Sequence, residues 1–161
     1  MAEKKRGPLG FLSAASLPYR RKSLLSPVEL EFYNVLKLAI GDRFLILLKL
    51  DLRDLCEITH RDVNQAAFNR VADEKMDFVL CDQATLAPVV AIELDDSTLY
   101  PRDRAERDTF MKELFRVIGV SLIHQRVQAR YDPAAIARWV DAAARSGRDA
   151  SPTPRPLRPA S

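Results

Sequence analysis

The apolar positions of the chain first become periodic after Ser26, where they predict a helix that ends at Gly41. Ser26 is a favourable N-cap, Pro27 suits the first helical position, and Glu29 stands where a capping box requires an acidic residue. A glycine such as Gly41 commonly terminates a helix. The residues that share one helical face are Val28, Phe32, Val35, Leu36 and Ala39.

Four short apolar runs predict β-strands, at residues 44–50, 77–81, 89–94 and 120–124. The second and third runs are separated by DQATLAP, a segment that favours a turn, so these two strands are expected to form a hairpin. The polar segment 52–74 is interpreted as a loop with a short helix.

Helical periodicity returns twice in the second half of the chain. Residues 102–118 repeat apolar positions at helical spacing and stop at Gly119, and Pro133 opens a last helix that reaches about Ala144. The order of elements is therefore α-β-β-β-α-β-α. This order predicts an α/β fold with a mixed central sheet flanked by helices.

The two ends of the chain differ from its centre. Residues 1–25 and 146–161 lack apolar periodicity and are predicted to be disordered, which leaves one domain at 26–145. Residues 1–26 hold six basic residues against one acidic residue (+5), residues 145–161 hold four against one (+3), and the total of +3 leaves −5 for the centre. Such arms either contact an anionic polymer or only keep the protein in solution, and composition leaves both readings open.

Two further features bear on location. No apolar run is long enough to span a bilayer, so no membrane association is expected. Cys56 and Cys81 have no nearby cysteine partner, so they are interpreted as buried thiols in a reducing cytoplasm rather than as zinc ligands.

Three carboxylates are expected to meet at one end of the sheet. Asp77 begins one strand of the predicted hairpin, and Glu93 and Asp95 end the other. Glu93 and Asp95 are two residues apart and therefore point to the same face. Converging carboxylates favour a hard divalent cation, Mg²⁺ or Mn²⁺. The alternative is a solvated acidic turn at the end of a strand.

This pattern resembles the core of the PD-(D/E)XK, or restriction-endonuclease-like, nuclease superfamily, which has the order α-β-β-β-α-β with acids on its second and third strands. More narrowly, residues 24–133 are similar to a bacterial family of a domain of unknown function within that superfamily, which is related in pattern to very-short-patch-repair endonuclease-like proteins. The similarity rests on the segments LLSPVELEFYNVL, DFVLCD, VVAIELDDST and RAERDTFMKELFRVIGVSLI.

The resemblance implies that Asp77 and Glu93 bind the metal and that Asp95, a further ligand, takes the place of the lysine found in many members of the superfamily. It also implies that Glu29 completes the site, although its capping role alone explains that residue. The Arg-Asp pair of the family corresponds to Arg107 and Asp108.

The chain also departs from the family pattern. Leu99 stands where the family has a histidine, and His124 stands where arginine is frequent. The loss of the histidine removes a candidate general base. Lys75 or Lys112 could supply the missing lysine, but the sequence selects neither.

Two hypotheses about function follow. The first is a Mg²⁺- or Mn²⁺-dependent nuclease that hydrolyses DNA. The second is a catalytically weakened nuclease-fold module that binds nucleic acid or a protein partner without cutting. The acids favour the first hypothesis, and the missing lysine and Leu99 favour the second. The sequence does not indicate an oligomeric state.

Overall fold

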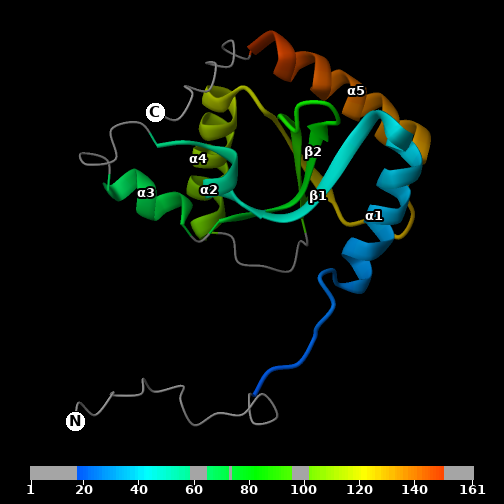
Figure 1. Cartoon of the computed structure of the whole chain (residues 1–161), viewed down its shortest axis with the longest axis horizontal. Coiled ribbons are helices and arrows are strands. Elements are labelled where there is room, and N and C mark those ends of the chain that lie inside the picture. The colour runs from blue at the N-terminus through cyan, green and yellow to red at the C-terminus, as the bar shows by residue number, and fades with distance from the viewer. Residues whose placement is uncertain (1–17, 59–64, 73, 96–101, 151–161) are drawn as a thin grey trace, which may run out of the picture.

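The computed structural model describes residues 18–58, 65–72, 74–95 and 102–150, which form one sheet with helices on both faces (Figure 1). This arrangement confirms the predicted α/β class. The elements in chain order are α1 (Pro27–Ile40), the 3₁₀-helix η2 (Gly41–Arg43), β1 (Phe44–Asp51), α2 (Leu52–Leu55), α3 (Gln65–Val71), β2 (Lys75–Asp82), β3 (Pro88–Asp95), α4 (Arg102–Ile118), β4 (Ser121–Arg126) and α5 (Pro133–Ala150).

Within the described residues, the sheet has four strands in the order β1-β2-β3-β4. β2 is antiparallel to β1 and to β3, which confirms the predicted hairpin, whereas β4 runs parallel to β3. Parallel neighbours require a crossover, and α4 lies in the connection between β3 and β4. The segment 52–74 contains two short helices, α2 and α3, where the sequence predicted one.

Each face of the sheet buries its own apolar cluster. The cluster beneath α1 and α5 includes Phe32, Leu36, Phe78, Ile92 and Val140. The cluster beneath α4 includes Met111, Phe115, Val79, Ala91 and, from α2, Leu52. The strands therefore sit between two helical layers, and the ends of the strands are the parts of the sheet that solvent can reach.

α1 begins as its sequence predicts. The Ser26 Oγ accepts a hydrogen bond from the Glu29 amide at 3.3 Å, and the Glu29 Oε2 accepts one from the Ser26 amide at 2.7 Å. Phe32 and Leu36 are fully buried, but Val28, which was assigned to the apolar face, is 41% exposed. Val28 lies in the first turn, where the helix projects beyond the sheet it covers (Figure 1).

α5 is longer than predicted. It continues to Ala150, beyond the predicted end near Ala144, so residues 146–150 are helical. Gly147 lets this part of the helix lie close to the sheet, because a Cβ atom there would lie 3.1 Å from the Val89 carbonyl oxygen. The rest of the two predicted disordered arms, residues 1–17 and 151–161, lies outside the described residues.

Two smaller findings concern the cysteines and the membrane. Cys81 is buried, Cys56 is half-buried, and the two form no disulfide with each other. Burial raises the pKa of both thiols. Among the helices of the described ranges, none has both the length and the apolar character that crossing a membrane requires.

The two layers generate a prediction about stability that uses a matched pair on α1. Leu36 is fully buried, whereas Leu38 is 76% exposed on the same helix. We expect Leu36→Ala to lower the free energy of unfolding by about 2–5 kcal/mol, because it leaves a cavity. Leu38→Ala should change it by less than about 0.5 kcal/mol. Urea denaturation of both variants measures the difference, and equal losses would contradict the assigned orientation of α1.

Candidate functional site

Asp77 and the end of β3 lie together at one end of the sheet. The β2–β3 ladder ends at the pair Phe78 and Ile92, and Asp77 is the next residue of β2 beyond it. The Asp77 Oδ2 accepts a hydrogen bond from the backbone amide of Leu94 at 2.9 Å. Leu94 stands between Glu93 and Asp95, so the predicted acids occupy the same end of neighbouring strands.

The regular alternation of β1 and β2 breaks at this end of the sheet. Leu48 and its partner Phe78 pack on the α1 side, but Leu50 and its partner Met76, two positions along, pack on the α4 side. In an unbroken strand, residues two apart share a face. The switch occurs at Lys49, whose φ of 53° lies in the left-handed region that a lysine rarely adopts. Strained backbone of this kind is frequent at functional sites.

Lys49 lies between two acids, in an arrangement called here the Lys49 cluster (Glu29, Lys49 and Asp77). Its Nζ donates hydrogen bonds to the Glu29 Oε1 and, at 2.7 Å, to the Asp77 Oδ1. Both carboxylates are 19% exposed and the lysine is 32% exposed. Glu29 therefore caps α1 with one oxygen and contacts the site with the other.

The ionisation of this cluster follows from its contacts. Burial raises the pKa of Glu29, but the hydrogen bonds from Lys49 and Ser26 outweigh it and hold the pKa below its usual value. Burial lowers the pKa of Lys49, but the hydrogen bonds to Asp77 and Glu29 outweigh it and hold the pKa above its usual value. Lys49 and Glu29 are therefore both charged at neutral pH.

A second group, the Arg107 cluster (Glu74, Glu93, Asp95, Arg107 and His124), is organised by α4. Arg107 reaches Glu93 Oε1 at 2.7 Å and Glu74 Oε2 at 2.9 Å. Burial lowers the pKa of Arg107, but hydrogen bonds to Glu93 and Glu74 outweigh it and raise the pKa further. Asp108, the other member of the Arg-Asp pair, is half-buried on the same helix.

His124 faces the acids from β4, where it is the register partner of Glu93. Its Nδ1 lies 3.6 Å from the Glu93 Oε2 and 3.8 Å from the Asp95 Oδ2, which is too far for a good hydrogen bond. Among the described residues, the Glu93 Oε2 and the His124 Nε2 are the buried side-chain polar atoms that have no hydrogen-bond partner. The Arg107 cluster thus holds a buried carboxylate oxygen that accepts no hydrogen bond from the described residues.

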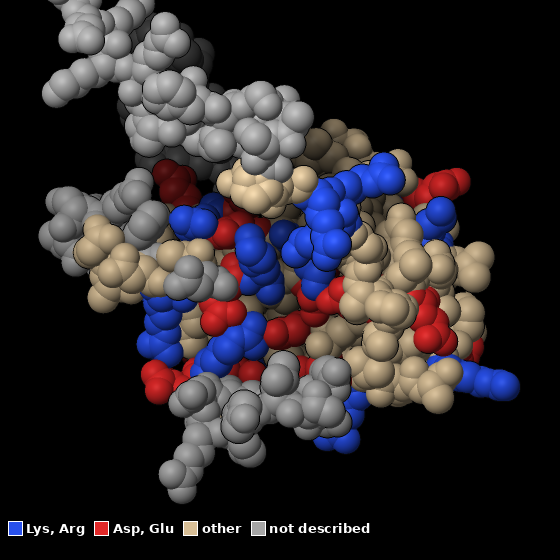
Figure 2. All heavy atoms as spheres, turned by 90° about the horizontal axis from the view of Figure 1, so that it is seen from below, with Lys and Arg blue, Asp and Glu red and all other residues tan. Residues whose placement is uncertain are grey.

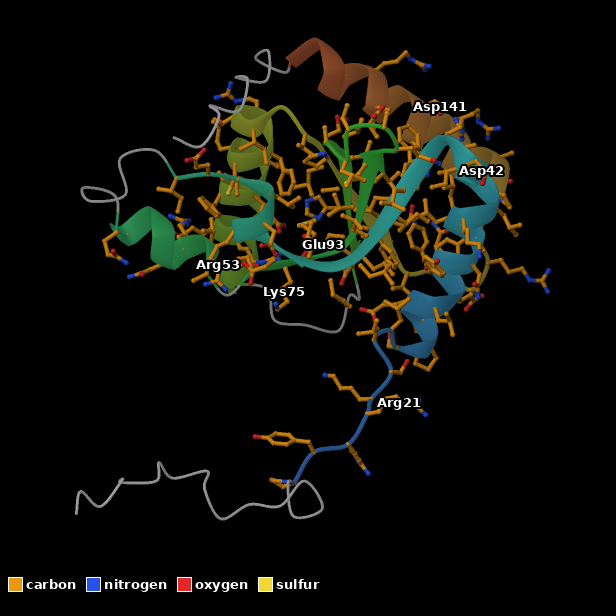
Figure 3. The ribbon with its side chains drawn as sticks, in the orientation of Figure 1. Arg21, Asp42, Arg53, Lys75, Glu93 and Asp141 are labelled. Atoms are coloured by element: carbon orange, nitrogen blue, oxygen red, sulfur yellow. The ribbon has the colours of Figure 1, made fainter. Side chains whose placement is uncertain are left out.

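The two clusters meet at the sheet end from opposite layers, because α1 carries Glu29 and α4 carries Arg107. Figure 3 shows Glu93 near the middle of the molecule, with Lys75 and Arg53 below it. Seen from below, acidic side chains lie in the middle of this face among basic ones (Figure 2). Five carboxylates against two cations give the combined clusters a formal charge of −3 when His124 is neutral.

The arrangement pairs acids with basic side chains. Within the described part of the chain, no group of three or more His, Cys, Asp or Glu residues is arranged to hold a metal ion. The predicted metal role of Asp77, Glu93 and Asp95 therefore stays a prediction. Leu99 lies outside the described residues.

Lys49 and Glu74 are members of the two clusters that the sequence did not reveal. Lys75 and Lys112 were considered as sources of the missing lysine, but Lys75 pairs with Asp51 and Lys112 lines a separate pocket with Gly147. The available signal was a single lysine inside the apolar run of β1. Lysine in such a run requires a partner or an exit to solvent.

A family described as "Protein of unknown function (DUF2726)" matches residues 21–143. The chain belongs to this family. The match includes both clusters, so the site is part of the DUF2726 domain, and it confirms the resemblance to a domain of unknown function. Neither the curated proteins nor the solved structures contain a match to the chain.

The Lys49 cluster generates a prediction about stability and pH. We expect Lys49→Met to lower the free energy of unfolding by about 1–3 kcal/mol at pH 7, because it leaves two partly buried carboxylates without their cation. Lys37→Met, at an exposed lysine of α1, is the control and should have little effect. Chemical denaturation measures both.

A double-mutant cycle with Glu29→Gln isolates the Lys49–Glu29 pair. The pKa of Glu29 is lowered on folding, so its contribution is present above about pH 4.5 and is lost as pH falls through its folded pKa. The pKa of Lys49 is raised, so its contribution is present below about pH 10.5 and is lost as pH rises through its folded pKa. A coupling energy that is the same at pH 3 and pH 7 would contradict the ion pair.

Proposed function

We propose that this DUF2726 protein is a metal-dependent phosphodiesterase that hydrolyses DNA, with the Lys49 and Arg107 clusters as its active site. The observation that carries the proposal is the meeting of Asp77, Glu93 and Lys49 at one sheet end, in a domain with the order α-β-β-β-α-β. That order, and acids on the second and third strands, support membership of the restriction-endonuclease-like superfamily. Asp95 occupies the position where many members of the superfamily have a lysine. In this proposal, Lys49 supplies that lysine from β1.

The charge of the site supports a cation. A formal charge of −3 repels a polyanion, so added positive charge favours the approach of a nucleic acid to this centre. The donor set suits a hard cation, since it consists of carboxylate oxygens, and the buried Glu93 Oε2 has no hydrogen-bond partner. Asp77 and Glu93 would hold Mg²⁺ or Mn²⁺, with Asp95 as a further ligand. When bound, such a metal lowers the pKa of a coordinated water and stabilises charge on a phosphate.

The residues of the chain have separate roles in this proposal. Lys49 offers its ammonium group to a phosphate oxygen, while Glu29 holds that ammonium in place. Arg107 fixes the Glu93 carboxylate through Oε1 and leaves Oε2 for the metal. In the hydrolysis, the oxygen of water forms a bond to phosphorus, the bond to one ester oxygen breaks, and that oxygen takes up a proton.

A second candidate is a module that binds nucleic acid without cutting it. The ion pairs favour this candidate, because Lys49 and Arg107 already pair with Asp77 and Glu93 without a metal. A site that is satisfied by its own cations has less need of a divalent ion. The two candidates differ in whether Mg²⁺ binds and whether DNA is cleaved.

Neutral variants of the acids test the proposal. We expect Asp77→Asn and Glu93→Gln each to reduce Mg²⁺-dependent cleavage of labelled DNA at least about 100-fold, because each removes a charged ligand with little change in volume. Asp42→Asn and Glu31→Gln, at exposed acids outside both clusters, are matched controls and should cleave like wild type. Unchanged far-UV circular dichroism would show that the fold is intact.

Metal linkage provides a second measurement. Mg²⁺ that binds only the folded protein should raise the melting temperature of wild type, by about 2.7 kcal/mol of stabilisation at 100 times its Kd. The Asp77 and Glu93 variants should gain less. Absence of both metal stabilisation and cleavage in wild type, with Mg²⁺ and Mn²⁺ and with single- and double-stranded DNA, would overturn the proposal and leave the binding module.

A further inference from the structure

A basic segment leads directly into the site from the N-terminal side. Residues 18–25 contain Arg20, Arg21 and Lys22, all exposed, and no acidic residue. The segment is attached to the domain by Leu25, which is buried beside α1. Within the segment, the Ser23 Oγ donates a 2.8 Å hydrogen bond to the Leu25 carbonyl oxygen. In Figure 3, Arg21 lies on the extended chain that leaves the first turn of α1.

A second pair of cations lies on the other side of the site, at the junction of β1, α2 and β2. Arg53 and Lys75 share one carboxylate, Asp51, at 2.9 Å and 3.5 Å. The two cations therefore lie side by side at this position. Both side chains are open to solvent, Arg53 to 46% and Lys75 to 61%, and Lys75 precedes Asp77 by two residues.

These groups place exposed cations on two sides of the −3 centre. A uniformly positive surface would bind a polyanion at any position. Two separate basic groups bind it at two fixed positions, so the part of the polymer between them lies over the centre. Nucleic-acid backbones are bound in this way, through lysine and arginine contacts to phosphates.

We propose that residues 20–22 and the Arg53–Lys75 pair are the two sides of a path along which the sugar–phosphate backbone of a nucleic acid crosses the site. The inference rests on the proposed function, since it explains how the substrate reaches Lys49 and the acids. Tyr19, which is 84% exposed beside Arg20, offers an aromatic face on which an unpaired base can stack.

A nucleic acid fits this surface better than an anionic membrane does. A flat bilayer that contacted both basic groups would also place its negative charge over the −3 centre. A narrow polymer needs to bring only one or two phosphates there, where Lys49 and a bound cation can receive them. Binding to anionic vesicles is therefore an outcome that would contradict the inference.

The test compares variants in which exposed cations are replaced by neutral glutamine, and the control removes as many cations as the arm variant does. The first removes the arm (R20Q, R21Q and K22Q), the second removes the pair (R53Q and K75Q), and the control removes three exposed cations elsewhere on the domain (K37Q, K112Q and R138Q). Fluorescence anisotropy measures the affinity for short labelled single- and double-stranded DNA in chelator, where no metal-dependent cleavage occurs, between about 50 and 200 mM salt. Thermal melting checks that each variant is folded.

Each lost phosphate contact should reduce the slope of log K against log salt by about 0.7–0.9. We expect the magnitude of this slope to fall by about 2–3 in the arm variant, by about 1–2 in the pair variant and by less than about 0.5 in the control. Tyr19→Ala should weaken binding of single-stranded DNA alone. Wild-type slopes in the arm and pair variants, an equal loss in the control, or a preference of wild type for phosphatidylserine vesicles over DNA would overturn the inference.

Failure of the path and failure of the proposed function give different results. If wild type binds DNA with the expected slopes but never cleaves it with Mg²⁺ or Mn²⁺, the proposed backbone path is supported and the catalytic proposal is wrong. If wild type cleaves DNA but the arm and pair variants retain its affinity and slope, the catalytic proposal stands and the path fails.

Discussion

Asp77 is the residue on which the organisation of the sheet end depends. One of its oxygens accepts the backbone amide of Leu94 where the β2–β3 ladder stops, and the other accepts from the ammonium group of Lys49. Hydrogen bonds to charged groups contribute about 1.5–3 kcal/mol each. A single carboxylate therefore terminates the ladder, fixes the strand that carries Glu93 and Asp95, and holds the lysine that departs from regular strand geometry.

The backbone at Lys49 shows what that arrangement costs. A non-glycine residue in the left-handed region is disfavoured by about 1–2 kcal/mol. Contacts with Glu29 and Asp77 offset this cost, and both contacts come from charged side chains. The strand is thus bent by electrostatics at the point where the side chain has to leave the apolar run. In α4, by contrast, Arg107 reaches its two acids from an ordinary helical backbone.

The fold could be predicted from the sequence wherever local signals agree. Ser26, Pro27 and Glu29 mark the start of α1, and a turn segment between two apolar runs marks the β2–β3 hairpin. The same hairpin places Asp77 at the end of the sheet that carries Glu93. Lys49 could not be predicted, because the alternation that assigns faces to residues breaks at that position. Nor could the pairing of Arg107 with Glu74, which are separated by 33 residues and meet only when α4 packs on the sheet. The end of α5 was missed because residues 146–161 lack apolar periodicity, whereas Gly147 lies close to the sheet in the fold.

Glu29 belongs to one helical layer and Arg107 to the other, so neither layer alone can complete the site. A chain in which only α1 and α5 had packed would contain Lys49 and Asp77 but would leave Glu93 without its arginine. A chain in which only α4 had packed would lack the acid that holds the lysine. The ion-paired arrangement of this charged centre is therefore complete only when both helical layers have packed on the sheet.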